Sequence, residues 1–221
     1  MIPVSMSSLR RLTGPGAGVA LILALGGCAL LSTPDPVQLY RFGPLDSPYV
    51  GERNTASVQV SLRRIEFPEA VSGQRILAVT GNEAAYVAGA RWVADAEDLY
   101  AQSLEMAFSS ERSGVRLIGG RELTRADAGL DVDITTFETR YAAPGATPSV
   151  VISARARLLS MPERTVVSEQ IFSVSQPASG NRLGAIVSAY DAATQDLNRQ
   201  IVVWVEANAA RAARADQRPA N

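Results

Sequence analysis

The chain contains no histidine and no lysine, so arginine supplies all 21 of its basic side chains. Without histidine there is no imidazole to act as a general base, to complete a Ser-His-Asp or Cys-His arrangement, or to ligate a metal ion. Without lysine there is no Schiff-base amine and no lysine for a phosphate-binding loop. These absences exclude the commonest nucleophilic, metal and nucleotide sites, and we expect a protein that is not an enzyme.

Sites made only of carboxylates remain open, because acids alone can bind a hard cation or hydrolyse a glycoside. Asp131 and Asp133 share one face of an extended strand, and Asp95, Glu97 and Asp98 form a second group. The first pair alternates with apolar residues, which is typical of a solvated strand face. The second group lies at a predicted helix start, where acids favour the positive end of the helix dipole. We interpret both groups as structural and expect no metal.

The single cysteine, Cys28, follows a short apolar run and cannot form a disulfide within the chain. Arg10 and Arg11 precede this run, which covers 16–25 and is, at about ten residues, half the length of a bilayer-spanning helix. A basic start, a short apolar middle and small residues before a break describe a secretory signal. The run ends in "LGGC" (25–28), which resembles the lipobox of bacterial lipoproteins. The alternative is a buried or reactive cysteine in a cytosolic protein.

The lipobox resemblance implies cleavage before Cys28 and attachment of a diacylglycerol and an N-acyl chain to that residue. Residues 1–27 are then a signal peptide, and 28–37 are a lipidated, proline-containing tether. Two or more acyl chains anchor a protein stably to a membrane. Ala29 stands where an aspartate would imply retention at the inner membrane, so the resemblance implies the periplasmic face of the outer membrane. We expect no cofactor besides these acyl chains.

The mature chain would hold 194 residues, 221 less the first 27, which is enough for one domain with a substantial core. Removal of Arg10 and Arg11 leaves 19 basic and 22 acidic residues, so the mature net charge is −3. The sequence also lacks a glycine-rich phosphate loop. We therefore expect no binding to nucleic acid.

Hydrophobic periodicity predicts strands, a helix, further strands and a second helix. The predicted strands are 38–42, 57–63, 75–79, 84–87, 115–118, 130–141, 150–160 and 165–175, and the last three are expected to form an antiparallel meander. One helix begins near Asp95 and ends near Gly114, and another follows Asn181 and ends near 208. The predicted fold is α/β: a single domain over 38–208 with a mixed, mostly antiparallel β-sheet packed by two main helices. We predict that 209–221 form a flexible tail.

Two residues before the first helix are candidates for contact with a partner. Tryptophan and arginine are enriched at binding hot spots, and here Arg91 and Trp92 stand side by side. The alternative for Trp92 is that it pins the entry of the helix onto the core. Trp204 lies on the apolar stripe of the second helix, so we predict that it belongs to the core.

Arg155 and Arg157 lie on the polar face of a predicted strand. We expect them to pair with acids on neighbouring strands in preference to acids on a partner. The candidate acids are Glu138, Glu163 and Glu169. Strand 38–42 follows the tether directly, and an edge strand in this place could add to the sheet of another subunit in a homo-oligomer.

Taken in order, these pieces resemble the auxiliary lipoproteins of ABC-type transport systems, the PqiC/YmbA-like family. The matching pieces are the lipobox, "YRF" at 40–42, "AYV" at 85–87, "RW" at 91–92, "VDITTFE" at 132–138, "VVISARARLL" at 150–159 and "LNRQIVVWV" at 197–205. The resemblance implies a non-enzymatic part in moving lipids or other apolar molecules across the envelope. The implied partners are an inner-membrane permease and ATPase, and an MCE-domain protein that bridges the periplasm and docks on this lipoprotein.

Two other functions compete with this one. A free-standing periplasmic carrier of lipids or small molecules requires an apolar cavity between helix and sheet. An envelope hydrolase would have to use serine or carboxylates without histidine, which the composition disfavours.

We predict that Cys28→Ala abolishes acyl labelling, because the thiol carries the diacylglycerol. The variant should be released from the membrane, or remain as an uncleaved precursor in the inner membrane. Labelling with radioactive palmitate and membrane fractionation measure both results. If the variant is still acylated and still found in the outer membrane, the lipobox interpretation is wrong.

Overall fold

The computed structural model describes residues 37–43, 58–110, 114–119, 125–161 and 163–215. By its contacts the chain divides into two units, Met1–Pro36 and Val37–Asn221. The predicted signal peptide, Cys28 and all of the predicted tether except Val37 lie outside the described residues. None of the helices in the described ranges combines the length and apolarity that crossing a bilayer requires.

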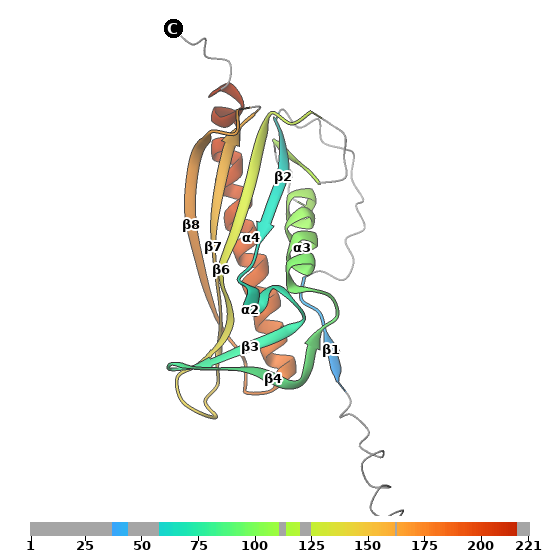
Figure 1. Ribbon diagram of the computed structural model, residues 1–221, viewed down its shortest axis with the longest axis vertical. Helices are drawn as coiled ribbons and strands as arrows, with labels where there is room; N and C mark the ends of the chain where they lie inside the picture. The colour runs from blue at the N-terminus through green and yellow to red at the C-terminus, as the bar shows by residue number, and fades with distance from the viewer. Residues whose placement is uncertain (1–36, 44–57, 111–113, 120–124, 162, 216–221) are drawn as a thin grey trace, which may run out of the picture. The chain divides into compact units, whose positions relative to one another are not determined.

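The described residues form eight strands and three helices, most of which are labelled in Figure 1. They are β1 (Gln38–Tyr40), β2 (Val58–Glu66), α2 (Glu69–Ser72), β3 (Arg75–Thr80), β4 (Glu83–Trp92), α3 (Ala96–Ser110), β5 (Val115–Ile118), β6 (Ala128–Tyr141), β7 (Ser149–Ser160), β8 (Val166–Pro177) and α4 (Leu183–Ala215).

All eight strands belong to one mixed sheet whose longest pairings are antiparallel. β6, β7 and β8 form the predicted antiparallel meander, and β3 and β4 form an antiparallel hairpin around Gly81. Shorter parallel pairings join β1 to β4, β2 to β5, and both β2 and β3 to β6. β6 is the central strand, because β2 and β3 pair with its two ends on one edge while β7 pairs along the other. The predicted α/β fold with a mixed, mostly antiparallel sheet is confirmed.

The two long helices pack as expected from their apolar stripes. α4 lies against β7 and β8 and also contacts α3 (Figure 1). Its inner stripe includes Leu197 and Ile201, which are fully buried, and the facing strand β7 contributes the equally buried Ala154 and Ala156. Alanines at these positions let the helix backbone approach the sheet closely. The predicted arrangement of two main helices on one sheet is thereby confirmed.

α4 is longer than the sequence pattern predicts. It continues to Ala215, so the prediction of a flexible tail over 209–221 is wrong for 209–215. Ala209 and Ala212 are fully buried and extend the inner stripe of the helix. Alanine has the highest helix propensity, but its side chain is only weakly hydrophobic. Hydropathy therefore does not distinguish a buried stripe of alanines from an exposed alanine-rich tail. Residues 216–221 lie outside the described residues.

The part of the core around α4 and β4 is a cluster of aromatic rings. Trp92 makes edge-to-face contacts with Phe42, at 5.0 Å between ring centroids, and with Tyr190, at 5.1 Å. Phe137 lies 4.9 Å from Tyr190 and 5.4 Å from Phe67. Edge-to-face aromatic pairs contribute stability beyond their buried area. The cluster joins the end of β1, β4, β6 and α4, so the sheet and the long helix share one packed centre.

We predict that Trp92→Ala lowers the free energy of unfolding by about 3–5 kcal/mol, because it leaves a large cavity at this centre. Urea unfolding of the purified protein measures the change. Val203→Ala on the outer side of α4, where the valine is 56% exposed, is the control and should change stability by less than about 0.5 kcal/mol. Equal effects of the two substitutions would contradict the central role of the cluster.

Candidate functional site

The predicted acidic pair on β6 is engaged with arginines. Asp133 accepts hydrogen bonds from Arg157 Nη2 at 2.6 Å and from Arg64 Nη2 at 3.2 Å. Asp131 is buried, and its Oδ2 lies 3.7 Å from Arg63 Nη1. Both carboxylates are therefore parts of an ionic network on the polar face of the sheet. In the described ranges no three His, Cys, Asp or Glu side chains gather as a metal site.

The network confirms that Arg157 pairs with an acid on a neighbouring strand, but the identity of that acid was not predicted. Its partner is Asp133, and not one of the glutamates Glu138, Glu163 and Glu169. Arg157 lies directly opposite Asp131 in the β6–β7 register and reaches Asp133 diagonally. Glu138 instead binds its own strand neighbour Arg140, with Nε 2.6 Å from Oε1. Arg155 lies opposite Asp133 and is exposed.

The second acidic group lies at the start of α3, as predicted. The Asp95 carbonyl accepts a hydrogen bond from Leu99 N at 3.0 Å, and Glu97 and Asp98 are in the first turn. The pKa of Glu97 is raised, first by burial and then by the neighbouring charges of Asp98, Glu66 and Asp95. These acids stand beside the positive end of the helix dipole, which favours negative charge. Their arrangement is that of a helix start.

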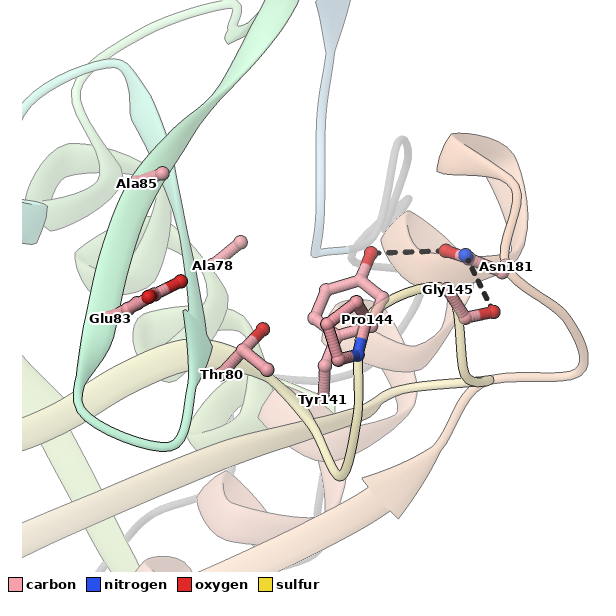
Figure 2. Close-up of a pocket in the computed structure, with 8 residues that line it drawn as sticks. All are labelled: Ala78, Thr80, Glu83, Ala85, Tyr141, Pro144, Gly145 and Asn181. Carbon is pink, nitrogen blue, oxygen red and sulfur yellow. Dashed lines mark hydrogen bonds between the residues drawn. The ribbon is translucent and has the colours of Figure 1, made fainter.

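A recess of the described surface lies between the β3–β4 hairpin and the segment that joins β6 to β7 (Figure 2). Its volume is about 340 Å³, and its lining residues are Ala78, Thr80, Glu83, Ala85, Tyr141, Pro144, Gly145 and Asn181. Tyr141 Oη donates to Asn181 Oδ1 at 3.0 Å, and Asn181 Nδ2 donates to Gly145 O at 3.3 Å. These two bonds brace one wall against the segment preceding α4. Partial burial raises the pKa of the Tyr141 hydroxyl.

This recess has the features of a contact site and lacks those of a catalytic one. Glu83 contributes the single carboxylate of its lining, and Ala78 and Ala85 contribute small apolar surfaces. Nothing in the lining forms a nucleophile–base pair of the kind that hydrolysis requires. A concave surface with a few polar groups can receive a side chain or a loop of another protein.

The structure separates the two predicted contact residues. Trp92 is only 1% exposed and packs among aromatic rings, so it is not available to a partner, and its role is the alternative one of pinning the helix entry. Trp204, 8% exposed, packs on Phe172 and is core, as predicted. Arg91 precedes Trp92 on the same strand and therefore points to the opposite face, where it is exposed.

Arg91 belongs to a surface that we call the arginine face, made of Leu39, Arg75, Tyr86 and Arg91. Leu39 on β1 and Arg75 on β3 are the register partners of Arg91 on its two sides. The guanidinium of Arg75 stacks over the ring of Tyr86, 3.7 Å from its centroid. Leu39 is 57% exposed and Tyr86 37%. This face therefore combines two cations with exposed apolar and aromatic surface.

Sequence reasoning missed Arg75 because a bulge sets the register. Counted back from the tight turn at Gly81, Arg75 would lie opposite Ala88. The β3–β4 pairing shifts between Arg75 and Leu77, and the shift brings Arg75 opposite Arg91. Gly89 has a positive φ of 67°, a conformation that glycine adopts without strain, and it lies within the stretch of β4 that is passed over. Gly89 was the sequence signal for a bulge in β4. A glycine does not indicate by how many residues the β3–β4 register shifts.

Comparison with known proteins identifies the family. Residues 44–202, more than half of the chain, match the family model described as the ABC-type transport auxiliary lipoprotein component. The chain belongs to this family. The identification confirms the resemblance drawn from the sequence. No curated protein matches the chain.

Two crystal structures share the fold of this auxiliary lipoprotein. A Xanthomonas campestris protein of the DUF330 family superposes with a TM-score of 0.65 at 22% identity, covering 85% of this chain and 100% of its own. A second, uncharacterized protein has a TM-score of 0.61 at 16% identity and covers 77% of this chain and 99% of its own. The α/β fold is therefore found in experimental structures of nearly the same extent.

In this auxiliary lipoprotein we predict that Asp133→Asn destabilises the fold by about 1–3 kcal/mol, because it removes charged hydrogen bonds from two arginines at once. The matched control is Asp196→Asn, whose carboxylate lies 3.6 Å from Arg199 in an exposed pair and should matter by less than about 0.5 kcal/mol. Chemical unfolding measures both. The destabilisation caused by Asp133→Asn should be smaller in a protein that already carries Arg157→Gln. An unchanged destabilisation would argue against the ion pair between Asp133 and Arg157.

Proposed function

We propose that this protein is a non-enzymatic component of an ABC-type envelope transport system, held at the periplasmic face of the outer membrane by acyl chains on Cys28. The observation that carries the proposal is the family match over 44–202 in a chain whose residues 25–28 resemble a lipobox. Alanine at position 29 supports the outer membrane as the destination. The acyl chains are the only attached groups that the proposal requires.

In this proposal the domain docks the MCE-domain protein that bridges the periplasm from the inner-membrane permease and ATPase. The cargo would be a lipid or another apolar molecule. The recess at Glu83 supports such docking, because it is concave and its wall is fixed by the hydrogen bonds of Tyr141 and Asn181. A preformed wall lowers the entropic cost of binding.

The alternative function, a free lipid carrier, would place its cavity between α4 and the sheet. That space is filled by side chains. Leu158 on β7 and Leu197, Ile201 and Val205 on α4 are all fully buried. Tight packing of this kind costs stability when it is opened. The interior therefore favours docking over carrying.

The partner can be identified by photo-crosslinking in the native envelope. Because the chain has no lysine, amine-reactive reagents find no side chain on it, and a photo-reactive residue must be introduced instead. We expect the residue placed at Glu83 to capture an MCE-domain protein, identified by mass spectrometry. The matched position is Val203, 56% exposed on the outer side of α4, which should capture nothing specific.

The same sample distinguishes the two functions. Pull-down without crosslinking should recover the permease and the ATPase together with the MCE-domain protein. Recovery of this protein alone with co-purifying lipid would contradict the docking function and support a free carrier. If the MCE-domain protein is captured by the photo-reactive residue at position 203 and not by the one at position 83, the docking surface lies on α4 and not at the recess.

A further inference from the structure

We propose that the arginine face (Leu39, Arg75, Tyr86 and Arg91) rests on the anionic phospholipid headgroups of the membrane to which the protein is anchored. The proposal depends on the lipid anchor of the proposed function. It adds a second contact with the bilayer and an orientation of the domain relative to it.

The first argument is the juxtaposition of two cations. Arg75 and Arg91 are directly opposite each other in the antiparallel β3–β4 pair, and like charges in this position destabilise a sheet. Among the described residues, no carboxylate forms an ion pair with either of them. An anion placed between the two guanidinium groups would relieve the repulsion. Guanidinium groups bind phosphate in a planar, bidentate manner.

Other arginines of the sheet show the contrast. Arg63, Arg64, Arg140 and Arg157 each lie within 4.0 Å of an Asp or Glu. These four arginines are therefore neutralised by pairing within the sheet. Stacking of Arg75 on Tyr86 holds that guanidinium in place without neutralising its charge. The arginine face is thus arranged for an anion that the described part of the chain does not supply.

The second argument is the length of chain between the anchor and the face. Leu39 lies in β1, the first strand, and nine residues (29–37) separate Cys28 from Gln38. A fully extended segment of this length spans about 30 Å at most. The anchor of the proposed function would therefore keep β1 within this length of the bilayer, and β4 and β3 follow β1 in the sheet (Figure 1). Such tethering gives a weak surface contact a high effective concentration.

The third argument is the chemistry of the exposed side chains. The mature chain has a net charge of −3, so an anionic surface repels the domain as a whole and favours approach through its cationic face. Leu39 and Tyr86 add exposed apolar and aromatic surface beside the arginines. Tyrosine is enriched at membrane interfaces, where one end of the side chain is apolar and the other is hydrated.

The experiment uses the full acylated protein reconstituted in vesicles of phosphatidylcholine alone or with one third phosphatidylglycerol. Hydrogen–deuterium exchange is followed in peptides covering 37–43 and 83–93. We expect slower exchange with phosphatidylglycerol, and loss of this protection in Arg75→Gln/Arg91→Gln and in 1 M salt. Each arginine near an anionic surface contributes about 1 kcal/mol, so the double variant should shift the docked equilibrium about 30-fold.

Two further variants test the cause of any loss. Arg155→Gln/Arg214→Gln removes the same charge from exposed positions on β7 and α4 and should keep the protection. Arg75→Lys/Arg91→Lys keeps the charge on the face and should retain most of the protection. Loss of protection in the β7/α4 variant, or full protection in Arg75→Gln/Arg91→Gln, overturns the proposal.

The remaining outcomes are separated on the same samples. Intact-mass measurement reports the acyl chains, so a missing acyl mass overturns the anchor and with it this proposal. An acylated protein with equal exchange in both vesicles overturns the proposal alone. Protection that appears only when purified MCE-domain protein is added, equally in both vesicles, would show that the face binds protein and would also overturn it.

Discussion

Edge-to-face packing around Trp92 is the interaction on which the rest of the structure depends. The chain is only 6% aromatic, yet Trp92, Phe42, Phe137 and Tyr190 meet at one point. These rings come from four separate parts of the chain and hold β1, β4 and β6 against α4. The buried hydroxyl oxygen of Tyr190 accepts a hydrogen bond from Thr139 Oγ1 at 3.2 Å, and burial raises the pKa of this tyrosine. The cluster is therefore apolar in bulk, and the Tyr190 hydroxyl within it has a hydrogen-bond partner.

Burial of Trp92 also decides what the surface presents. Neighbouring residues of a strand point to opposite faces of the sheet. Because the side chain of Trp92 points into the core, that of Arg91 must point outward. The bulge in the β3–β4 hairpin then places Arg75 beside it. A core contact and a surface feature are thus two sides of the same strand. For this reason the arginine face cannot be moved without repacking the aromatic cluster.

Arginine is the only basic residue of the chain, and the sheet places it on two kinds of surface. On the polar face of β6 and β7, Asp133 binds Arg64 and Arg157 together, so these two cations are paired within the sheet. On the arginine face neither Arg75 nor Arg91 forms an ion pair within the described residues, and we propose an external anion for them. Together with the recess at Glu83, this arrangement gives the proposed transport component one side for its membrane and another for a partner. Buried side chains fill the space under α4, which favours the proposed docking function over the alternative of a lipid carrier.

The sequence by itself determined the class of fold, the order of its strands and two main helices, and the family, but not the short helix α2. Period-2 alternation and short connections sufficed for the meander of β6, β7 and β8, because these contacts join strands adjacent in the chain. Composition alone excluded every site that requires a histidine or a lysine side chain. The tertiary structure decided which residues meet. Asp133 as the partner of Arg157, and Arg75 opposite Arg91, follow from strand register, and bulges shift register by amounts that no local pattern encodes. The end of α4 likewise depends on the burial of Ala209 and Ala212. Because alanine occurs on both buried and exposed helix faces, the sequence does not show that these residues are packed.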